Sequence, residues 1–176
     1  EAPVPIFSAE KMTATPFSRA EQPGIRARYG RLLGAGALIA ALHGPSFVRP
    51  LLDSDEAVYA SIAALVNAGG RLYAEGGVDN TFPGIYWTYA AVFRVFGQYS
   101  MGAVHALALL VVIGSAFCLA RIAGRIGGER AAWLAAVLYG VLTTFYYPKM
   151  LAANTEVFMT LPLAAPGVIA GIVLGF

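Results

Sequence analysis

The sequence predicts an all-α integral membrane protein with about four transmembrane helices. Hydrophobic residues make up 58% of the chain, charged residues only 12%, and the mean hydropathy is +0.66. Soluble domains carry about 25% charged residues, so this chain has about half of the usual share. At about 20 residues a span, its 176 residues fit a small bundle of helices. The net charge of +2 is too small to indicate nucleic acid as a partner.

Four apolar segments have the length and composition of membrane spans. They lie at about 32–48, 100–120, 131–147 and 157–176. Residues 1–29 are polar and lack the apolar centre of a cleavable signal, so we expect a mobile cytoplasmic tail. Small residues are frequent in the spans and allow close helix packing in lipid. Pro162 and Pro166 should kink the fourth span.

A fifth apolar segment, residues 83–96, is too short to span. Its 14 residues rise about 21 Å as a helix, whereas the hydrocarbon core is about 30 Å thick. It contains Arg94 and five aromatic residues, which favour the headgroup region. We therefore expect a helix along the membrane surface, with Pro83 in its first turn and Gly97 at its end. It belongs to an outer loop, residues 49–99, that also holds a predicted helix from Asp55 to Ala68.

The arginines predict the orientation of the chain. With four spans, two groups of three arginines fall on one side: Arg26, Arg28, Arg31, Arg121, Arg125 and Arg130. The positive-inside rule places that side in the cytoplasm. We therefore expect a bacterial inner (cytoplasmic) membrane location, with the N-terminus in the cytoplasm and the outer loop on the opposite side of the lipid bilayer.

Acidic residues gather near the predicted outer membrane face. Asp53, Asp55 and Glu56 follow the first span, and Glu156 precedes the fourth. Carboxylates at one face can hold a divalent metal or activate a hydroxyl. A structural explanation is also available. Asp53 and Glu56 fit a helix capping box, and Glu156 can simply begin a helix.

Three stretches of the outer loop, residues 53–59, 69–73 and 79–86, resemble the first outer loop of GT-C-fold glycosyltransferases. These membrane enzymes are related to protein O-mannosyltransferases and to the aminoarabinose transferase of lipid A. Their pattern is an Asp-Glu pair soon after the first span, a nearby Tyr, and a Pro-containing entry to a surface helix. Residues 154–156 resemble the second outer loop, which supplies another acid. The resemblance covers about residues 30–165.

The resemblance implies a transferase that takes a sugar from a polyprenyl-phosphate donor at the outer face. Asp55 then matches the catalytic acid, with Glu56 beside it, and Glu156 matches the acid of the second loop. Asp55 and Glu156 are also the implied ligands of a divalent metal. The substrate-binding candidates are Tyr59, Arg71 and Lys149. For Arg71 and Lys149, ordinary anchoring at the membrane interface is the alternative.

The pattern departs from the family in two respects. Many relatives have a Lys before the Pro of the surface helix, where this chain has Asn80-Thr81-Phe82. Family enzymes also have many more spans, so the resemblance implies the N-terminal part of such an enzyme. Its partners would include the missing C-terminal half or other membrane chains.

The alternative function is a non-catalytic accessory subunit of a larger membrane complex, of the respiratory or photosynthetic type. His43 and His105 lie in the predicted spans, and a neutral imidazole can ligate a haem or chlorophyll-type metal. Both histidines lie near span ends, where a hydrogen bond to a neighbouring helix or to water is the favoured role. Cys118 is expected to pack as a small apolar group.

Overall fold

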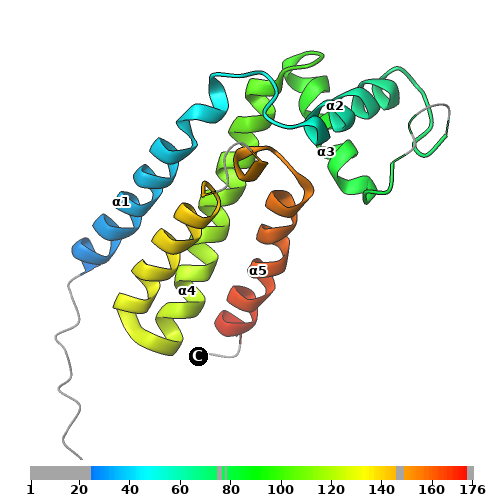
Figure 1. Ribbon diagram of the computed structural model, residues 1–176. Coiled ribbons are helices and arrows are strands. Elements are labelled where there is room, and N and C mark those ends of the chain that lie inside the picture. Colours follow the sequence, from blue (N-terminus) through cyan, green and yellow to red (C-terminus); the bar gives the residue numbers. More distant parts are fainter. Residues whose placement is uncertain (1–24, 75–76, 78, 146–148, 174–176) are drawn as a thin grey trace, which may run out of the picture.

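The computed structural model describes residues 25–74, 77, 79–145 and 149–173. These residues form helices and no strand, so the all-α prediction is confirmed. The helices are α1 (Ile25–His43), α2 (Ser54–Asn67), α3 (Pro83–Phe96), α4 (Met101–Leu142) and α5 (Thr155–Val173), with short 3₁₀ segments at Gly44–Phe47 and Lys149–Leu151. Figure 1 shows α1, α4 and α5 together in a bundle, with α2 and α3 at one end of it.

Helix α4 is two helices joined at Gly128. This residue has φ 72° and ψ −169°, a conformation that glycine adopts far more readily than other residues. The chain reverses direction at this point (Figure 1). The sequence predicts a loop between spans here, and the structure replaces that loop with a turn around a single glycine. The half from Glu129 to Leu142 rises only about 21 Å.

Two sets of contacts define the ends of the bundle. At the first end, Arg31 near the start of α1 pairs with Glu129 just after the reversal, at 3.0 Å. We call this the arginine end. At the second end, the Phe47 ring lies edge-on to His105 near the start of α4, with centroids 6.4 Å apart. We call this the Glu56 end, after the residue at its centre. Helix α1 therefore runs the full length between the two ends.

Helix α5 runs parallel to the first half of α4, from the Glu56 end to the arginine end. The Leu161 side chain packs on Gly114 near the Glu56 end, and Ile122 packs on Gly167 closer to the arginine end. The chain therefore passes between the two ends four times, through α1, the two halves of α4, and α5. This alternation is the topology expected of a chain with four spans.

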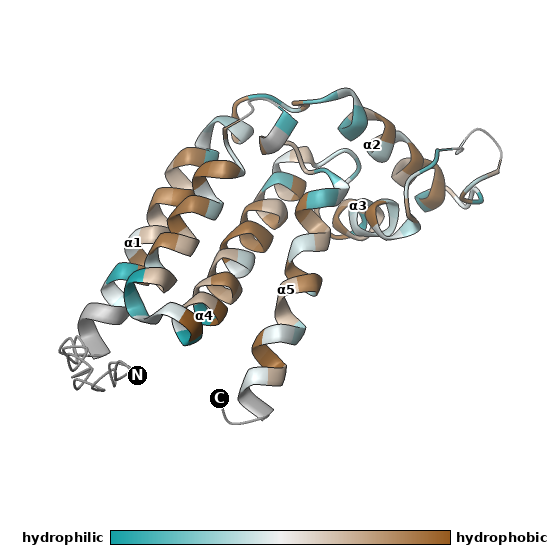
Figure 2. Ribbon diagram, turned by 60° about the horizontal axis from the view of Figure 1, so that its bottom comes forward, coloured by the Kyte–Doolittle hydropathy of each residue, from teal (hydrophilic) through white to brown (hydrophobic). Residues whose placement is uncertain are grey.

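Only α4, among the described residues, is long and apolar enough to cross a membrane by length and composition. In α5 the apolar helical stretch, Thr155–Gly171, is shorter. Figure 2 shows hydrophobic residues along the bundle helices and hydrophilic residues toward the ends. The four-span count stays a prediction.

Parts of the predicted segments lie outside the described residues. These are residues 1–24 of the tail, 75, 76 and 78 of the outer loop, 146–147 of the third span and 174–176 of the fourth. Residues 25–29, expected in the tail, form the beginning of α1. Helix α1 begins seven residues before the predicted first span and ends five residues before that span's predicted end, and the two halves of α4 contain most of the predicted spans 100–120 and 131–147.

Close packing between α1 and α4 gives a first testable prediction. A Cβ atom added at Gly140 would collide with Ile39 Cγ1, and Ile39 is only 1% exposed. Gly140→Ala should therefore lower the free energy of unfolding by about 1–3 kcal/mol. Gly34 has open space around it, so Gly34→Ala should be neutral or stabilising by about 0.5–1 kcal/mol. Thermal unfolding in detergent compares the two. Equal melting temperatures would contradict the described packing.

Candidate functional site at the Glu56 end

Glu56 lies at the centre of the junction between the outer loop and the bundle. It is in the first turn of α2 and is completely buried. Its Oε1 accepts hydrogen bonds from His105 Nε2 at 3.0 Å and from the Ala153 N–H at 2.6 Å. Its Oε2 accepts the Leu52 N–H at 2.7 Å. One carboxylate therefore links α2, the start of α4 and the loop before α5.

The helix start around Glu56 has the residues of the predicted capping box but neither of its two hydrogen bonds. In a capping box the N-cap side chain accepts the N–H of the residue three positions on, here Glu56. Asp53 is the N-cap of α2, and its Oδ1 accepts the Ser54 N–H at 2.7 Å. In a capping box the Glu side chain would return to the N–H of the cap residue itself. Here Glu56 reaches one residue further back, to Leu52. This leaves its other oxygen for His105 and Ala153.

The Glu56 carboxylate remains charged despite its burial. Burial alone raises the pKa of a carboxyl group. The hydrogen bonds from His105, Leu52 and Ala153 act in the opposite direction and outweigh it, so the pKa of Glu56 lies below its usual value of 4.5. Both oxygens are occupied by protein donors, which leaves a substrate no access to Glu56 in this arrangement.

The lowered pKa predicts a loss of stability in acid. A carboxyl group whose folded pKa is depressed stabilises the folded state above its unfolded pKa, and this contribution disappears as the pH falls through the folded pKa. When the pH is lowered below about 4.5, the melting temperature should therefore decrease. Glu56→Gln should melt lower at neutral pH and lose less on acidification. Melting curves from pH 7 to pH 3 test this, and an identical acid loss in both proteins would contradict it.

Three buried tyrosines join α2 to α3. The Tyr59 ring lies edge-on to Tyr86 and Tyr89, with centroids 5.8 and 5.9 Å apart. Tyr89 donates its hydroxyl to the carbonyl of Ala153 at 2.9 Å, and burial raises its pKa. The Ala153 residue is thus held by Glu56 through its N–H and by Tyr89 through its C=O. Tyr59, predicted to bind substrate, is 6% exposed and lies within this packing.

Of the three buried tyrosines, Tyr86 also contacts the loop that leads into α3. Its hydroxyl donates to Asp79 Oδ2 at 2.6 Å. This hydrogen bond is the main cause that lowers the pKa of Asp79. Through this bond the Asp79 carboxylate holds the loop before α3 against the helix.

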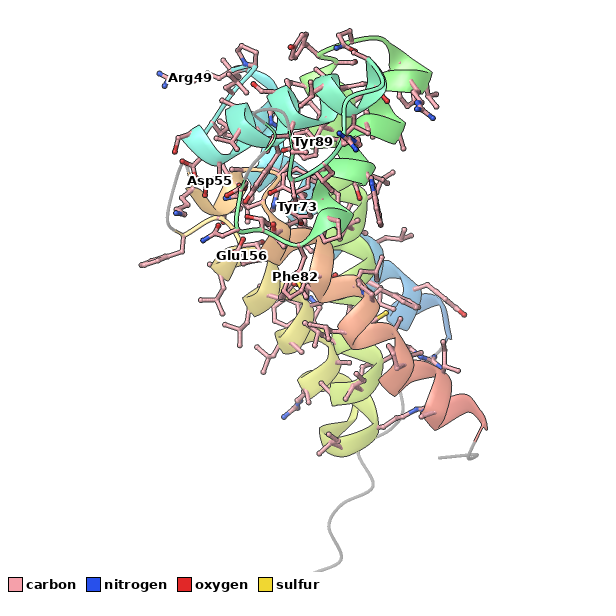
Figure 3. All side chains as sticks on the ribbon, turned by 90° about the vertical axis from the view of Figure 1, so that its right-hand side faces the viewer. Arg49, Asp55, Tyr73, Phe82, Tyr89 and Glu156 are labelled. Atoms are coloured by element: carbon pink, nitrogen blue, oxygen red, sulfur yellow. The ribbon has the colours of Figure 1, made fainter. Side chains whose placement is uncertain are left out.

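Asp55 and Lys149 bring the first turn of α2 and the segment before α5 together at an exposed position. Asp55 Oδ2 lies 3.8 Å from Lys149 Nζ, and the two side chains are 44% and 57% exposed. Glu156, also exposed, lies in the first turn of α5. Figure 3 shows Asp55 and Glu156 on the same side of the molecule, at the end of the bundle that carries α2. Two predicted site residues therefore meet, with a third at the same end.

The donor set does not fit the implied metal site. Among the described residues, no three His, Cys, Asp or Glu side chains come together closely enough to hold a metal ion. Asp55, one of the two implied ligands, is paired with the Lys149 ammonium, whose positive charge opposes a cation. The residues at this position therefore do not fit a divalent metal.

Among the other polar groups near this end, some have interactions within the chain and some buried oxygens have no hydrogen-bond partner. Arg71 is exposed after α2 and already has an interaction within the chain. The Asn154 side chain donates to the Lys149 carbonyl at 3.3 Å. Among the described residues near this end, three buried side-chain oxygens have no hydrogen-bond partner: Asp53 Oδ2, Asn154 Oδ1 and Thr155 Oγ1. Asn154 lies in the stretch 154–156 that carries the resemblance, but its low exposure of 5% depends on the fold.

Both histidines have hydrogen-bond partners within the chain, and the cysteine is a free thiol. His105 Nε2 bonds Glu56, and His43 Nδ1 lies 3.0 Å from the carbonyl oxygen of Ile39. Both imidazoles are buried. Cys118 is a half-buried free thiol in α4. Each histidine therefore has one ring nitrogen committed to a hydrogen bond within the chain.

Comparison with known proteins gives no relative for this arrangement. No family model, no curated protein and no solved structure matches the chain.

Proposed function

We propose that this chain is the N-terminal membrane part of a glycosyltransferase that uses a polyprenyl-phosphate-linked sugar at the outer membrane face. The observation that carries the proposal is the exposed pair of Asp55 and Lys149, 3.8 Å apart. A positioned carboxylate can take a proton from an acceptor hydroxyl. An ammonium group beside it can bind a phosphate. The pair thus supplies the two functions that transfer from a phosphate-linked sugar requires.

The reaction would use the two side chains at opposite ends of the reacting bond. The acceptor hydroxyl oxygen attacks the anomeric carbon and gives its proton to Asp55. The bond from that carbon to the phosphate oxygen breaks, and polyprenyl phosphate leaves with its charge beside Lys149. Glu156, exposed at the same end, is available to bind hydroxyl groups of the sugar or the acceptor.

Glu56 has a positioning role in this proposal. It is buried and bonded to the Ala153 N–H, so it fixes α2, which carries Asp55, against the loop that carries Lys149. The predicted catalytic role of Glu56 is thereby replaced with one that acts through Asp55 and Lys149. The distance between the two exposed groups depends on this buried carboxylate.

The outer face of α3 fits the headgroup region of a bilayer. The helix buries one side against α2, while Trp87, Val95 and Phe96 are 59%, 74% and 66% exposed. Exposed aromatic and aliphatic side chains next to Arg94 are typical of a helix lying in the membrane interface. In that position α3 keeps the Asp55–Lys149 pair near the level of a lipid-linked phosphate.

A transfer assay tests the proposal. Membranes from cells that express the complete gene product would be incubated with radiolabelled polyprenyl-phosphate sugars and with lipid and protein acceptors. We expect label to enter an acceptor, and membranes from cells lacking the gene to show none. No transfer from any donor, or the same transfer without the gene, would overturn the proposal.

One observation favours the accessory-subunit alternative. Gly30 and Gly34, four residues apart on α1, are exposed, and a Cβ at either position would meet open space. Such small-residue spacing allows another membrane helix to approach closely. Purification in mild detergent distinguishes the two functions. A stoichiometric partner that is lost in Gly34→Leu, together with no sugar transfer, would support the accessory role.

A further inference from the structure

A groove lies at the arginine end, between α1 and the second half of α4. It has a volume of about 460 Å³ and is lined by Arg31, Arg130, Trp133 and Leu134. Arg31 is paired with Glu129 at 3.0 Å. Arg130 is exposed, and within the described residues no carboxylate pairs with it. The groove therefore carries one uncompensated positive charge.

The residues that line the groove place a cationic group nearer the arginine end and apolar groups nearer the middle of the bundle. Trp133 and Leu134 follow Arg130 by about one helical turn toward the middle of the bundle, and both are exposed. A guanidinium group binds a phosphate through paired N–H donors, and Trp favours the level of the headgroups. A free phosphate would gain nothing from the apolar wall. A neutral headgroup would leave Arg130 without a partner.

We propose that this groove binds one anionic phospholipid. Its phosphate contacts Arg130 and Arg31, and an acyl chain lies against Trp133 and Leu134. Glu129 limits the affinity, because its carboxylate holds Arg31 and repels the phosphate. The site requires α1 and α4 to lie in a bilayer, but it is independent of sugar transfer and lies at the opposite end of the bundle from Asp55.

Native mass spectrometry of the full chain, released from detergent micelles, tests the proposal. The protein is titrated with phosphatidylglycerol and, separately, with phosphatidylcholine. We expect the chain to retain phosphatidylglycerol preferentially. One arginine near the surface changes the binding of an anionic lipid about fivefold, so Arg130→Gln should weaken retention by about that factor. Glu129→Gln should strengthen it, an effect that misfolding cannot produce.

The matched control is Arg49→Gln. It removes the same charge from an exposed position beyond Phe47, near the Glu56 end, and should leave phosphatidylglycerol retention unchanged. Equal weakening by Arg49→Gln would show nonspecific attraction and overturn the proposal. Equal retention of phosphatidylcholine, or displacement of the lipid by millimolar inorganic phosphate, would also overturn it.

Discussion

Glu56→Ala is expected to lower the free energy of unfolding by about 3–5 kcal/mol, because removing one partner from a buried charged network leaves the other groups uncompensated. The groups that lose their acceptor are His105 Nε2 and the N–H groups of Leu52 and Ala153. For a chain of this size the change corresponds to a melting temperature lower by about 10 °C. Thermal unfolding in detergent measures it.

Two further variants separate the hydrogen bonds of Glu56 from its volume. Glu56→Gln keeps the size but turns one acceptor into a donor that faces other donors, so we expect an intermediate loss of about 2 kcal/mol. Glu156→Gln changes the same chemical group at an exposed position and should stay within about 0.5 kcal/mol of the parent protein. If Glu56→Ala melted like Glu156→Gln, the junction would not hold the two loops together.

Asp55→Asn is expected to reduce sugar transfer by about 10²–10⁴-fold, the usual contribution of a general base. The asparagine keeps the size of the side chain but cannot accept the proton of the acceptor hydroxyl. The melting temperature should hardly change, because Asp55 is exposed and its pairing with Lys149 at 3.8 Å is a surface ion pair of about 0–1 kcal/mol. Steady-state kinetics with a labelled polyprenyl-phosphate sugar measure the loss.

Lys149→Gln provides the comparison for the proposed phosphate contact. It should raise KM for the lipid-linked donor more than it lowers kcat, whereas Asp55→Asn should act mainly on kcat. Full transfer activity in Asp55→Asn would show that the base is another group. Because Glu56→Ala is expected to unfold more easily, a loss of activity in that variant alone would say nothing about catalysis.

Local signals predicted the outer-loop helices well. Helix α3 begins at Pro83 and is followed by Gly97, which has a positive φ of 100°. These are residues whose backbone preferences act within one turn. Asp53 likewise marks the start of α2. The reversal at Gly128 was less apparent, because the length of a turn between two apolar segments depends on how closely the packed helices approach.

The different environments of Asp55 and Glu56 could not be predicted from the sequence. Asp55 and Glu56 are neighbours, yet one is exposed and the other is buried. The difference depends on His105 and Ala153, which lie 49 and 97 residues from Glu56. Tyr59 shows the same limitation, since its burial results from packing against α3. Residue type and local spacing identify candidates, and only distant contacts separate reactive carboxylates from structural ones.

The bond between Glu56 and Ala153 has a consequence for biosynthesis. Its partners are 97 residues apart, and at about 5–20 residues per second translation needs about 5–20 s to cover that distance. During this interval the carboxylate lacks its last donor and must stay hydrated. The junction therefore closes only when the segment just before α5 has emerged. A nascent chain arrested before that point would display an open acidic junction to quality-control proteases.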